Sequence, residues 1–273
     1  MKIAVLQMTS GIDPAANART IVDAIVEAKQ GGAAILFTPE VSGLVDRDRA
    51  RAALSLRSQA DDVVLAAVRA AATEQGLWVH LGSLGLTEGA RLANRGFVID
   101  AAGEIRTQYD KLHLFDVDLP TGESWRESAS YDPGSSATLV ETPVGMLGLS
   151  ICYDIRFPDL YRALSDAGAT MLAVPAAFTQ PTGAAHWHVL LRARAIEASC
   201  FVVAAAQTGT HEDGRATFGH SLVVDPWGEV LLDMGEAPGL GFAEIDQARL
   251  TDVRARVPAL RHRRAIPDVA IAR

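Results

Sequence analysis

Apolar and polar positions follow one another along the chain in a way that predicts alternating strands and helices. Residues 2–8 and 33–37 are short apolar runs typical of buried strands, and between them Asp13 and Pro14 begin a helix that should end before two glycines. The same order of strand, helix and strand recurs at residues 146–178. Such a unit favours neighbouring parallel strands joined by a right-handed crossover.

Other segments extend this pattern. A helix should begin at Asp61 and end at Gly76, and the turn between residues 95–100 and 104–109 predicts an antiparallel hairpin. Residues 111–134 show little periodicity and predict a long surface loop, of the kind that is usually functional. The remaining predictions are strands at 78–83, 170–178 and 201–207, a helix near 188–199, a hairpin of 220–225 with 229–233, and an edge strand at 241–245.

Composition agrees with a layered α/β protein. The 273 residues are 49% hydrophobic but only 6% aromatic, which favours helices and sheets rich in Ala, Val and Leu. No linker or low-complexity stretch interrupts the chain, and its two halves resemble each other in element order. We therefore predict one domain over 1–273, in which two similar sheets pack face to face with helices outside. The basic segment from about 247 to 273 should form a surface or interface arm.

Charge and cysteine content exclude several classes of function. A net charge of −8 disfavours nonspecific binding to nucleic acid. No apolar run approaches the roughly 20 residues that cross a bilayer, and no signal peptide is recognisable. The two cysteines lie far apart in sequence, which predicts free thiols in a reducing, cytoplasmic compartment. No glycine-rich phosphate loop is present, so no nucleotide cofactor is implied.

Cys152 occupies a position suited to a nucleophile. It follows the apolar run 146–151, and Asp154 and Pro158 predict that a helix begins just beyond it. Exposed N–H groups and the dipole at a helix N-terminus would favour a thiolate and a developing oxyanion. A buried, inert core cysteine is the competing interpretation, and it is the one that we prefer for Cys200.

A nucleophilic thiol also needs a base and a group that stabilises the oxyanion. Glu40 follows the strand at 33–37, at the sheet edge where α/β proteins place their sites, and a carboxylate whose pKa is raised by poor solvation could accept the thiol proton. Lys111 begins the long loop and could face the oxyanion. Considered alone, Glu40 and Lys111 could each equally be an ordinary surface residue.

Three sequence blocks carry a family resemblance. FTPE at 37–40, YDKLHLFD at 109–116 and GLSICYDIRFP at 148–158 resemble the signature blocks of the carbon-nitrogen hydrolase, or nitrilase, superfamily. The resemblance implies a four-layer αββα sandwich, a Glu-Lys-Cys triad carried onto Glu40, Lys111 and Cys152, and a second glutamate at Glu127. It implies neither a cofactor nor a metal.

Two further blocks, at 182–197 and 219–230, look most like a branch of small-acid amidases acting on substrates such as deaminated glutathione, with omega-amidases close behind. The implied reaction begins when Cys152 attacks the amide carbon. Lys111 and a backbone N–H near Tyr153 then stabilise the oxyanion, and Glu40 protonates departing ammonia before it activates water to hydrolyse the thioester. His188 departs from the branch pattern, in which an acidic residue is expected.

The substrate pocket and the subunit number follow from the same likeness. Tyr153, Phe178 and Thr179 should line the pocket of a small-molecule amide, and Arg156 is a candidate partner for a substrate carboxylate. A homodimer formed through a helical face is expected. Alternatives that stay open are an omega-amidase acting on alpha-ketoglutaramate, a true nitrilase using the same triad, and a noncatalytic scaffold of the same fold.

Two neighbouring histidines are the candidates for a metal site in the sequence. His186 and His188 are two residues apart, a spacing that does not place them on one helix face. Without a third clustered ligand in the sequence, a structural role is favoured and no metal is predicted.

Overall fold

Two six-stranded sheets form the centre of the computed structural model, which describes residues 1–118, 122 and 124–272. The first sheet contains β1 (Lys2–Gln7), β2 (Ile35–Phe37), β3 (Trp78–Glu88), β4 (Arg91–Ile99), β5 (Ile105–Asp110) and β16 (Gly239–Glu244), in the order β16-β1-β2-β3-β4-β5. The second contains β8 (Leu139–Thr142), β9 (Gly145–Leu149), β10 (Met171–Ala173), β11 (Phe201–Ala204), β14 (Leu222–Val224) and β15 (Val230–Asp233), in the order β15-β14-β11-β10-β9-β8.

The two sheets share a topology. Strands β1, β2 and β3 are mutually parallel in the first sheet, as are β9, β10 and β11 in the second, and antiparallel strands complete both sheets. The predicted repetition of strand, helix and strand is therefore confirmed, as are the hairpins β4–β5 and β14–β15 and the edge strand β16.

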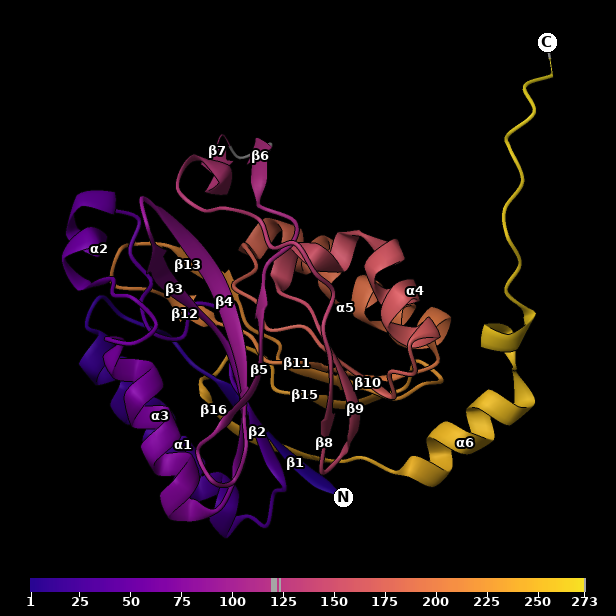
Figure 1. The fold of residues 1–273 in the computed structure, drawn as a ribbon, viewed down its shortest axis with the longest axis horizontal. Coiled ribbons are helices and arrows are strands. Elements are labelled where there is room, and N and C mark those ends of the chain that lie inside the picture. The colour runs from indigo at the N-terminus through magenta and orange to yellow at the C-terminus, as the bar shows by residue number, and fades with distance from the viewer. Residues whose placement is uncertain (119–121, 123, 273) are drawn as a thin grey trace.

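Helices cover the outer faces of both sheets (Figure 1). Helices α1 (Pro14–Gln30) and α3 (Val63–Gln75) pack on the first sheet, while α4 (Pro158–Asp166) and α5 (Gln180–Ala198) lie on the second. The Asp13 carboxylate caps α1 by accepting the N–H of Ala15, as its position before Pro14 predicts. These layers confirm the predicted α/β sandwich of two stacked mixed sheets.

Strand β1 shows how the sequence builds these layers. Ile3 and Val5 point into the core between the sheets, whereas Ala4 and Leu6 pack against the helices on the outer face. Because both faces of the strand are covered, its residues are apolar almost without interruption. This packing places the ends of strands from both sheets close to one another, which positions the functional site.

Several segments differ from the sequence-based prediction. The short helix α2 (Arg49–Ser55) was missed because it buries no residue and therefore lacks an apolar stripe. Strand β8 was also missed. The segment predicted to be a long loop contains a hairpin of β6 (Asp116–Asp118) and β7 (Ser124–Arg126), followed by a 3-10 turn. A second small hairpin joins β12 (Thr208–Thr210) to β13 (Ala216–Phe218).

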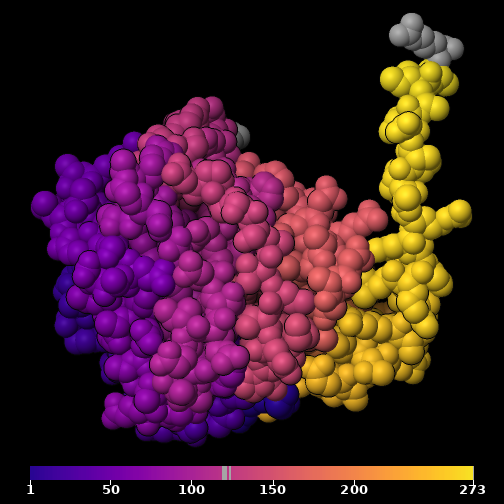
Figure 2. Space-filling model, viewed as in Figure 1, coloured from indigo at the N-terminus to yellow at the C-terminus, as the bar shows by residue number. Residues whose placement is uncertain are grey.

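The C-terminal part leaves the body of the molecule. Helix α6 (Gln247–Arg256) and a 3-10 turn at Ala259–His262 are followed by an extended segment that stands clear of the sandwich (Figures 1 and 2). Arg263 still contacts Ser165 and Asp166 of α4, so the part that stands clear, 264–272, is called the C-terminal arm below. Among the described residues, none of the helices combines the length and the apolar character required to traverse a bilayer.

Candidate active site

Cys152 lies on a sharp turn after strand β9. Its φ is +48°, in the left-handed region that non-glycine residues rarely adopt, and its N–H donates to the carbonyl of Pro175 at 2.9 Å. The turn continues as a 3-10 segment, Cys152–Arg156, and α4 begins only at Pro158. The predicted helix with Pro158 in its first turn is thus confirmed, but a 3-10 segment separates Cys152 from it.

Asp154 holds this turn in place, although it was expected to cap the following helix. Its buried carboxylate accepts the N–H of Ile151 at 2.8 Å, the hydroxyl of Tyr109 at 2.7 Å and the N–H of His113 at 3.0 Å. Tyr109 and His113 flank Lys111 in the sequence. Asp154 thereby fixes the segment that carries Cys152 to the segment that carries Lys111.

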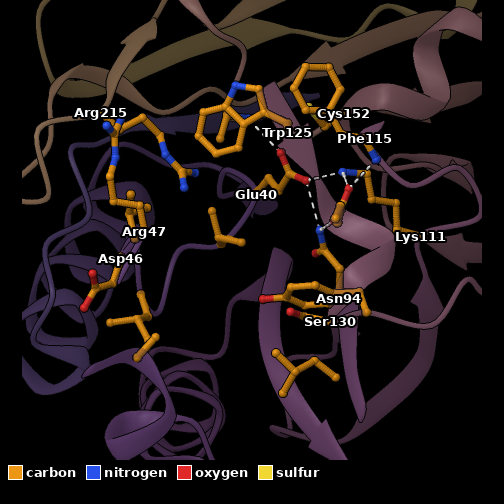
Figure 3. Close-up of a pocket in the computed structure, with 18 of the residues that line it drawn as sticks. Glu40, Asp46, Arg47, Asn94, Lys111, Phe115, Trp125, Ser130, Cys152 and Arg215 are labelled. Carbon is orange, nitrogen blue, oxygen red and sulfur yellow. Dashed lines mark hydrogen bonds and ion pairs between the residues drawn. The ribbon is translucent and has the colours of Figure 1, made fainter. Parts of the chain in front are cut away.

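Lys111 lies between two carboxylates in the interior (Figure 3). Its Nζ is 2.8 Å from Oε1 of Glu40 and 2.9 Å from Oε2 of Glu127, and the side chain is almost fully buried. Glu40 also accepts the backbone N–H of Ala177, and Glu127 accepts that of Phe115. The structure therefore brings together Glu40, Lys111, Glu127 and Cys152, which all line one cavity.

Asn94 joins this group, and sequence reasoning missed it. Its amide Nδ2 donates to Oε1 of Glu40 at 3.0 Å and to Oε1 of Glu127 at 3.1 Å. The only sequence signal is a polar residue within the apolar strand β4. Its partners are distant in sequence, so nothing in the chain alone connects it to them.

The ionisation of the buried groups follows from these contacts. Burial by itself raises the pKa of Glu40, but the charge of Lys111 and the hydrogen bonds from Lys111, Cys152 and Asn94 outweigh burial and lower that pKa below its usual value. Burial opposes the charge on Lys111, but Glu127 and Glu40 raise its pKa well above the usual range. Glu40 is thus a carboxylate and Lys111 an ammonium ion at neutral pH.

Cys152 is a neutral thiol in the same environment. Burial, followed by the adjacent Glu40 carboxylate, raises the pKa of Cys152 well above its usual value, and Lys111 opposes this only partly. Two electrostatic expectations were therefore wrong: the free thiol is not a thiolate, and the pKa of Glu40 is lowered, not raised. A thiol that hydrogen-bonds to a carboxylate can be activated by proton transfer during attack.

The cavity above these groups has a volume of about 680 Å³. Tyr153, Phe178 and Thr179, the predicted pocket residues, line it. Arg156 is not among the lining residues; it lies against the rings of Tyr153 and Phe178 and contacts His186. A pocket of this size and mixed polarity is typical of small-molecule sites.

One cluster outside the cavity has the composition of a metal site. Donor atoms of His188, His220 and Asp233 lie within 4.8 Å of one another. Each imidazole already hydrogen-bonds to the Asp233 carboxylate, at 3.0 Å from His188 and 2.8 Å from His220. The group is thus satisfied internally, which gives His188 a structural contact between α5 and β15. His186 is not a member of the cluster.

Cys200 has the properties expected of a core cysteine. Its side chain is completely buried and its sulfur contacts the carbonyl of Ala169. Burial raises the pKa of this thiol to about 11. Cys200 is absent from the residues that line the cavity, unlike Cys152.

Comparisons with known proteins show which family this chain belongs to. Residues 2–255 match the family model described as carbon-nitrogen hydrolase. Human deaminated glutathione amidase is 42% identical over 98% of this chain and 83% of its own length. In the solved structures, the Caenorhabditis elegans NitFhit protein has 40% identity and a TM-score of 0.89, covering 96% of this chain and 65% of its own, longer chain.

A third relative has a reactive cysteine. A variant of the amidase from Nesterenkonia sp. AN1 shows acrylamide added at its active-site cysteine. That structure has 29% identity and a TM-score of 0.80, and the match covers 94% of this chain and 98% of its own. The family model and these relatives each match nearly the whole of this chain. This chain therefore belongs to the carbon-nitrogen hydrolase family and is an amidase.

Proposed function

We propose that this amidase hydrolyses the amide bond of deaminated glutathione or a closely related small acid, with Cys152 as nucleophile. The observation that carries this proposal is the buried contact of Lys111 with Glu40 and Glu127 at the base of the cavity that Cys152 lines. The name of the human relative, which is 42% identical over nearly the whole chain, supports the substrate class.

The first step couples attack to proton transfer. Glu40 accepts the Cys152 proton as the sulfur bonds to the amide carbon, which is consistent with the raised pKa of the thiol and the lowered pKa of the carboxylate. Lys111 stabilises the oxyanion together with the backbone N–H of Tyr153, which donates to no group among the described residues.

The second half of the reaction regenerates the thiol. Glu40 passes its proton to the leaving nitrogen, so an amine or ammonia departs and a thioester remains on Cys152. Glu40 then takes a proton from water as the oxygen attacks the thioester carbon, and it returns the proton to the sulfur as the acid leaves. Glu127 holds Lys111 in position throughout.

Cavity size favours deaminated glutathione over alpha-ketoglutaramate. Hydrolysis of the former releases a dipeptide, whereas the latter, an omega-amidase substrate, releases only ammonia. A volume of about 680 Å³ leaves room for the larger leaving group. Comparing kcat/KM for the two substrates, with chromatography of the products, tests this choice. Higher kcat/KM for alpha-ketoglutaramate would favour the omega-amidase alternative.

The remaining alternatives require different measurements. A true nitrilase would release ammonia from a nitrile faster than from the matching amide. A noncatalytic scaffold would turn over neither, and iodoacetamide would label Cys152 and Cys200 at similar slow rates. The proposed amidase requires fast, selective labelling of Cys152, because of the two thiols only this one lines the cavity and lies beside the Glu40 carboxylate.

The proposed enzyme is a homodimer that works in the cytoplasm. Ile266, Val269 and Ile271 of the C-terminal arm are 79%, 86% and 83% exposed, and apolar side chains on an extended segment favour docking on a second copy. Two free, buried thiols agree with a reducing compartment. Analytical ultracentrifugation of the full chain and of a chain ending at residue 263 tests the dimer: the full chain should dimerise, and the shortened chain should dimerise more weakly because it keeps only the expected helical-face contact.

A further inference from the structure

The cavity extends well beyond the groups that would act on an amide. Besides the catalytic candidates, it is lined by Val45, Arg47 and Ala52 from the segment around α2, by Trp125 from β7, and by Arg215, which precedes β13. Arg215 and Arg47 lie on the opposite side of Glu40 from Lys111 (Figure 3). This side of the cavity is called the arginine end below.

The guanidinium of Arg215 lacks a close acidic partner. Its side chain is only 19% exposed, and the nearest carboxylate oxygen, from Asp213, is 3.9 Å from Nε. The Asp213 carboxylate already accepts the backbone N–H groups of Arg47 and Arg215, both at 2.8 Å. Within the described part of the chain, the Arg215 Nε is buried without a hydrogen-bond partner, which is uncommon for so polar a group.

A second unpaired donor lies beside it. The indole Nε1 of Trp125 is also buried and has no hydrogen-bond partner among the residues that the structure describes, and the Arg215 guanidinium stacks over this ring at 4.5 Å. Asn94 Oδ1 is another unpaired atom, so three of the four such side-chain atoms among the described residues belong to residues that line this one cavity. Two of these atoms, on Arg215 and Trp125, are hydrogen-bond donors that lie side by side, and donors gathered at a cavity favour a ligand that accepts hydrogen bonds.

Charge at the arginine end indicates what that ligand is. Of the acidic residues that line the cavity, Glu40 and Glu127 share Lys111, and Asp46 forms a two-pronged pair with Arg51 at 2.6 and 2.8 Å. These acids are therefore already compensated, whereas Arg215 is not. Burial, the largest influence, lowers the pKa of Arg215, as expected for a cation that has lost water without gaining a close anion.

We propose that Arg215, supported by Trp125 and Arg47, binds a carboxylate of the substrate at a distance from the amide that is cleaved. A planar guanidinium matches a carboxylate with two parallel hydrogen bonds, which would use donors that otherwise stay unpaired. The site therefore selects amides that carry a remote carboxylate over neutral amides of the same length. This inference rests on the proposed amidase activity and adds a residue that determines specificity.

A matched series of substrates tests the proposal. Monoamides of dicarboxylic acids of increasing length are compared with their methyl esters, which differ only in the remote charge. The wild-type protein should prefer the acid over the ester by at least tenfold in kcat/KM at the best length. In Arg215→Gln, kcat/KM for the acid should fall about 10- to 100-fold, mainly through KM, while the ester is cleaved as before.

Two further variants separate charge from structure. Arg215→Lys keeps the charge but loses the planar fork, so it should retain part of the preference for the acid. Arg106→Gln removes an exposed arginine of β5 that does not line the cavity, and it should leave both substrates unaffected. Equal losses on acid and ester in Arg215→Gln, or no preference for the acid in the wild-type protein, would overturn the inference.

Binding measurements make failure of the inference distinguishable from failure of the proposed function. If no amide is cleaved, the amidase proposal fails, but the dicarboxylates of the same series can still be titrated into the protein by calorimetry. Binding that is present in the wild-type protein and lost in Arg215→Gln supports the carboxylate site without any turnover. Absence of binding, or equal binding by both proteins, excludes it.

Discussion

Nζ of Lys111 lies 2.8 Å from Oε1 of Glu40, and the two buried side chains neutralise each other where the strands of the first sheet end. A second carboxylate, Glu127, shares the same ammonium ion. Attraction between opposite charges in the interior offsets the cost of taking them out of water, but only while all partners are present. Lys111 is therefore as important to the fold as to the proposed chemistry.

Replacement of Lys111 should show this dual role. Lys111→Met leaves two buried carboxylates without their cation, so the free energy of unfolding in urea should fall by about 3–5 kcal/mol. The matched change Lys29→Met removes an exposed lysine that donates a hydrogen bond to the carbonyl of Gly76, and it should cost less than about 1 kcal/mol. In the double variant Glu40→Gln/Lys111→Met, the loss should be smaller than the sum of the single losses. Unchanged stability of Lys111→Met would contradict this picture of the site.

The pH dependence of turnover should be a broad plateau. The reactive form has an ionised Glu40 and a neutral Cys152 thiol, because the pKa of Glu40 lies below its usual 4.5 and that of Cys152 well above its usual 9.0. With a neutral amide as substrate, kcat/KM should stay level between about pH 5 and 9, fall at lower pH as Glu40 is protonated, and fall at higher pH only once Cys152 ionises. A tenfold rise per pH unit between 6 and 9 would instead mean that a preformed thiolate is required.

The free energy of unfolding should also depend on the ionisation of Glu40 and Lys111. Since the pKa of Glu40 is lowered on folding, its stabilising contribution is complete above pH 4.5 and is lost as the pH falls through the folded value. Since the pKa of Lys111 is raised, its contribution is complete below pH 10.5 and is lost only as the pH rises through the folded value. Urea unfolding at a series of pH values measures both limits, and Lys111→Met should remove the alkaline one.

Asn94 is expected to position the two glutamates. Asn94→Ala removes hydrogen bonds to both carboxylates, so kcat should fall about 10- to 100-fold while Cys152 remains reactive. Asn94→Gln keeps the amide on a longer side chain and should recover part of the rate. Steady-state kinetics and circular dichroism spectra of both variants provide the measurement. Full activity of Asn94→Ala would show that Lys111 alone suffices to position the pair.

Backbone strain at Cys152 gives a prediction that is independent of activity. Its φ of +48° suits glycine, so Cys152→Gly should be more stable than Cys152→Ala by about 1 kcal/mol, although both variants are inactive. At Ala70, an exposed position within α3, the order should be reversed: Ala70→Gly should lower the free energy of unfolding by about 1 kcal/mol. A more stable alanine variant at 152 would mean that the turn relaxes once the sulfur is removed.

Local sequence signals predicted where helices begin and where buried strands lie. Asp13 before Pro14 located the start of α1, and uninterrupted apolar runs located β1 and β9, because capping and two-sided burial leave a direct trace in the residue order. The pairing of Glu40, Lys111 and Cys152 was inferred from family blocks and not from periodicity. The structure brings these residues together, while their catalytic roles stay predictions.

Other features depend on contacts that no local pattern encodes. Asp154 looked like a helix cap, but its carboxylate reaches across the sandwich to Tyr109 and His113. The pKa of Glu40 was expected to rise with burial, and only the 2.8 Å contact with Lys111 reverses that direction. Arg215 was likewise inconspicuous until the fold placed it against Trp125.

The most direct test of the proposed chemistry is to trap the covalent intermediate. Protein mixed with a slowly hydrolysed amide is quenched in acid, digested and mapped by mass spectrometry. We predict an acyl group in thioester linkage on Cys152, absent from Cys152→Ala, accumulating in step with release of the amine. Turnover that continues in Cys152→Ala, or an acyl group on any other residue, would contradict the assignment of Cys152 as the nucleophile.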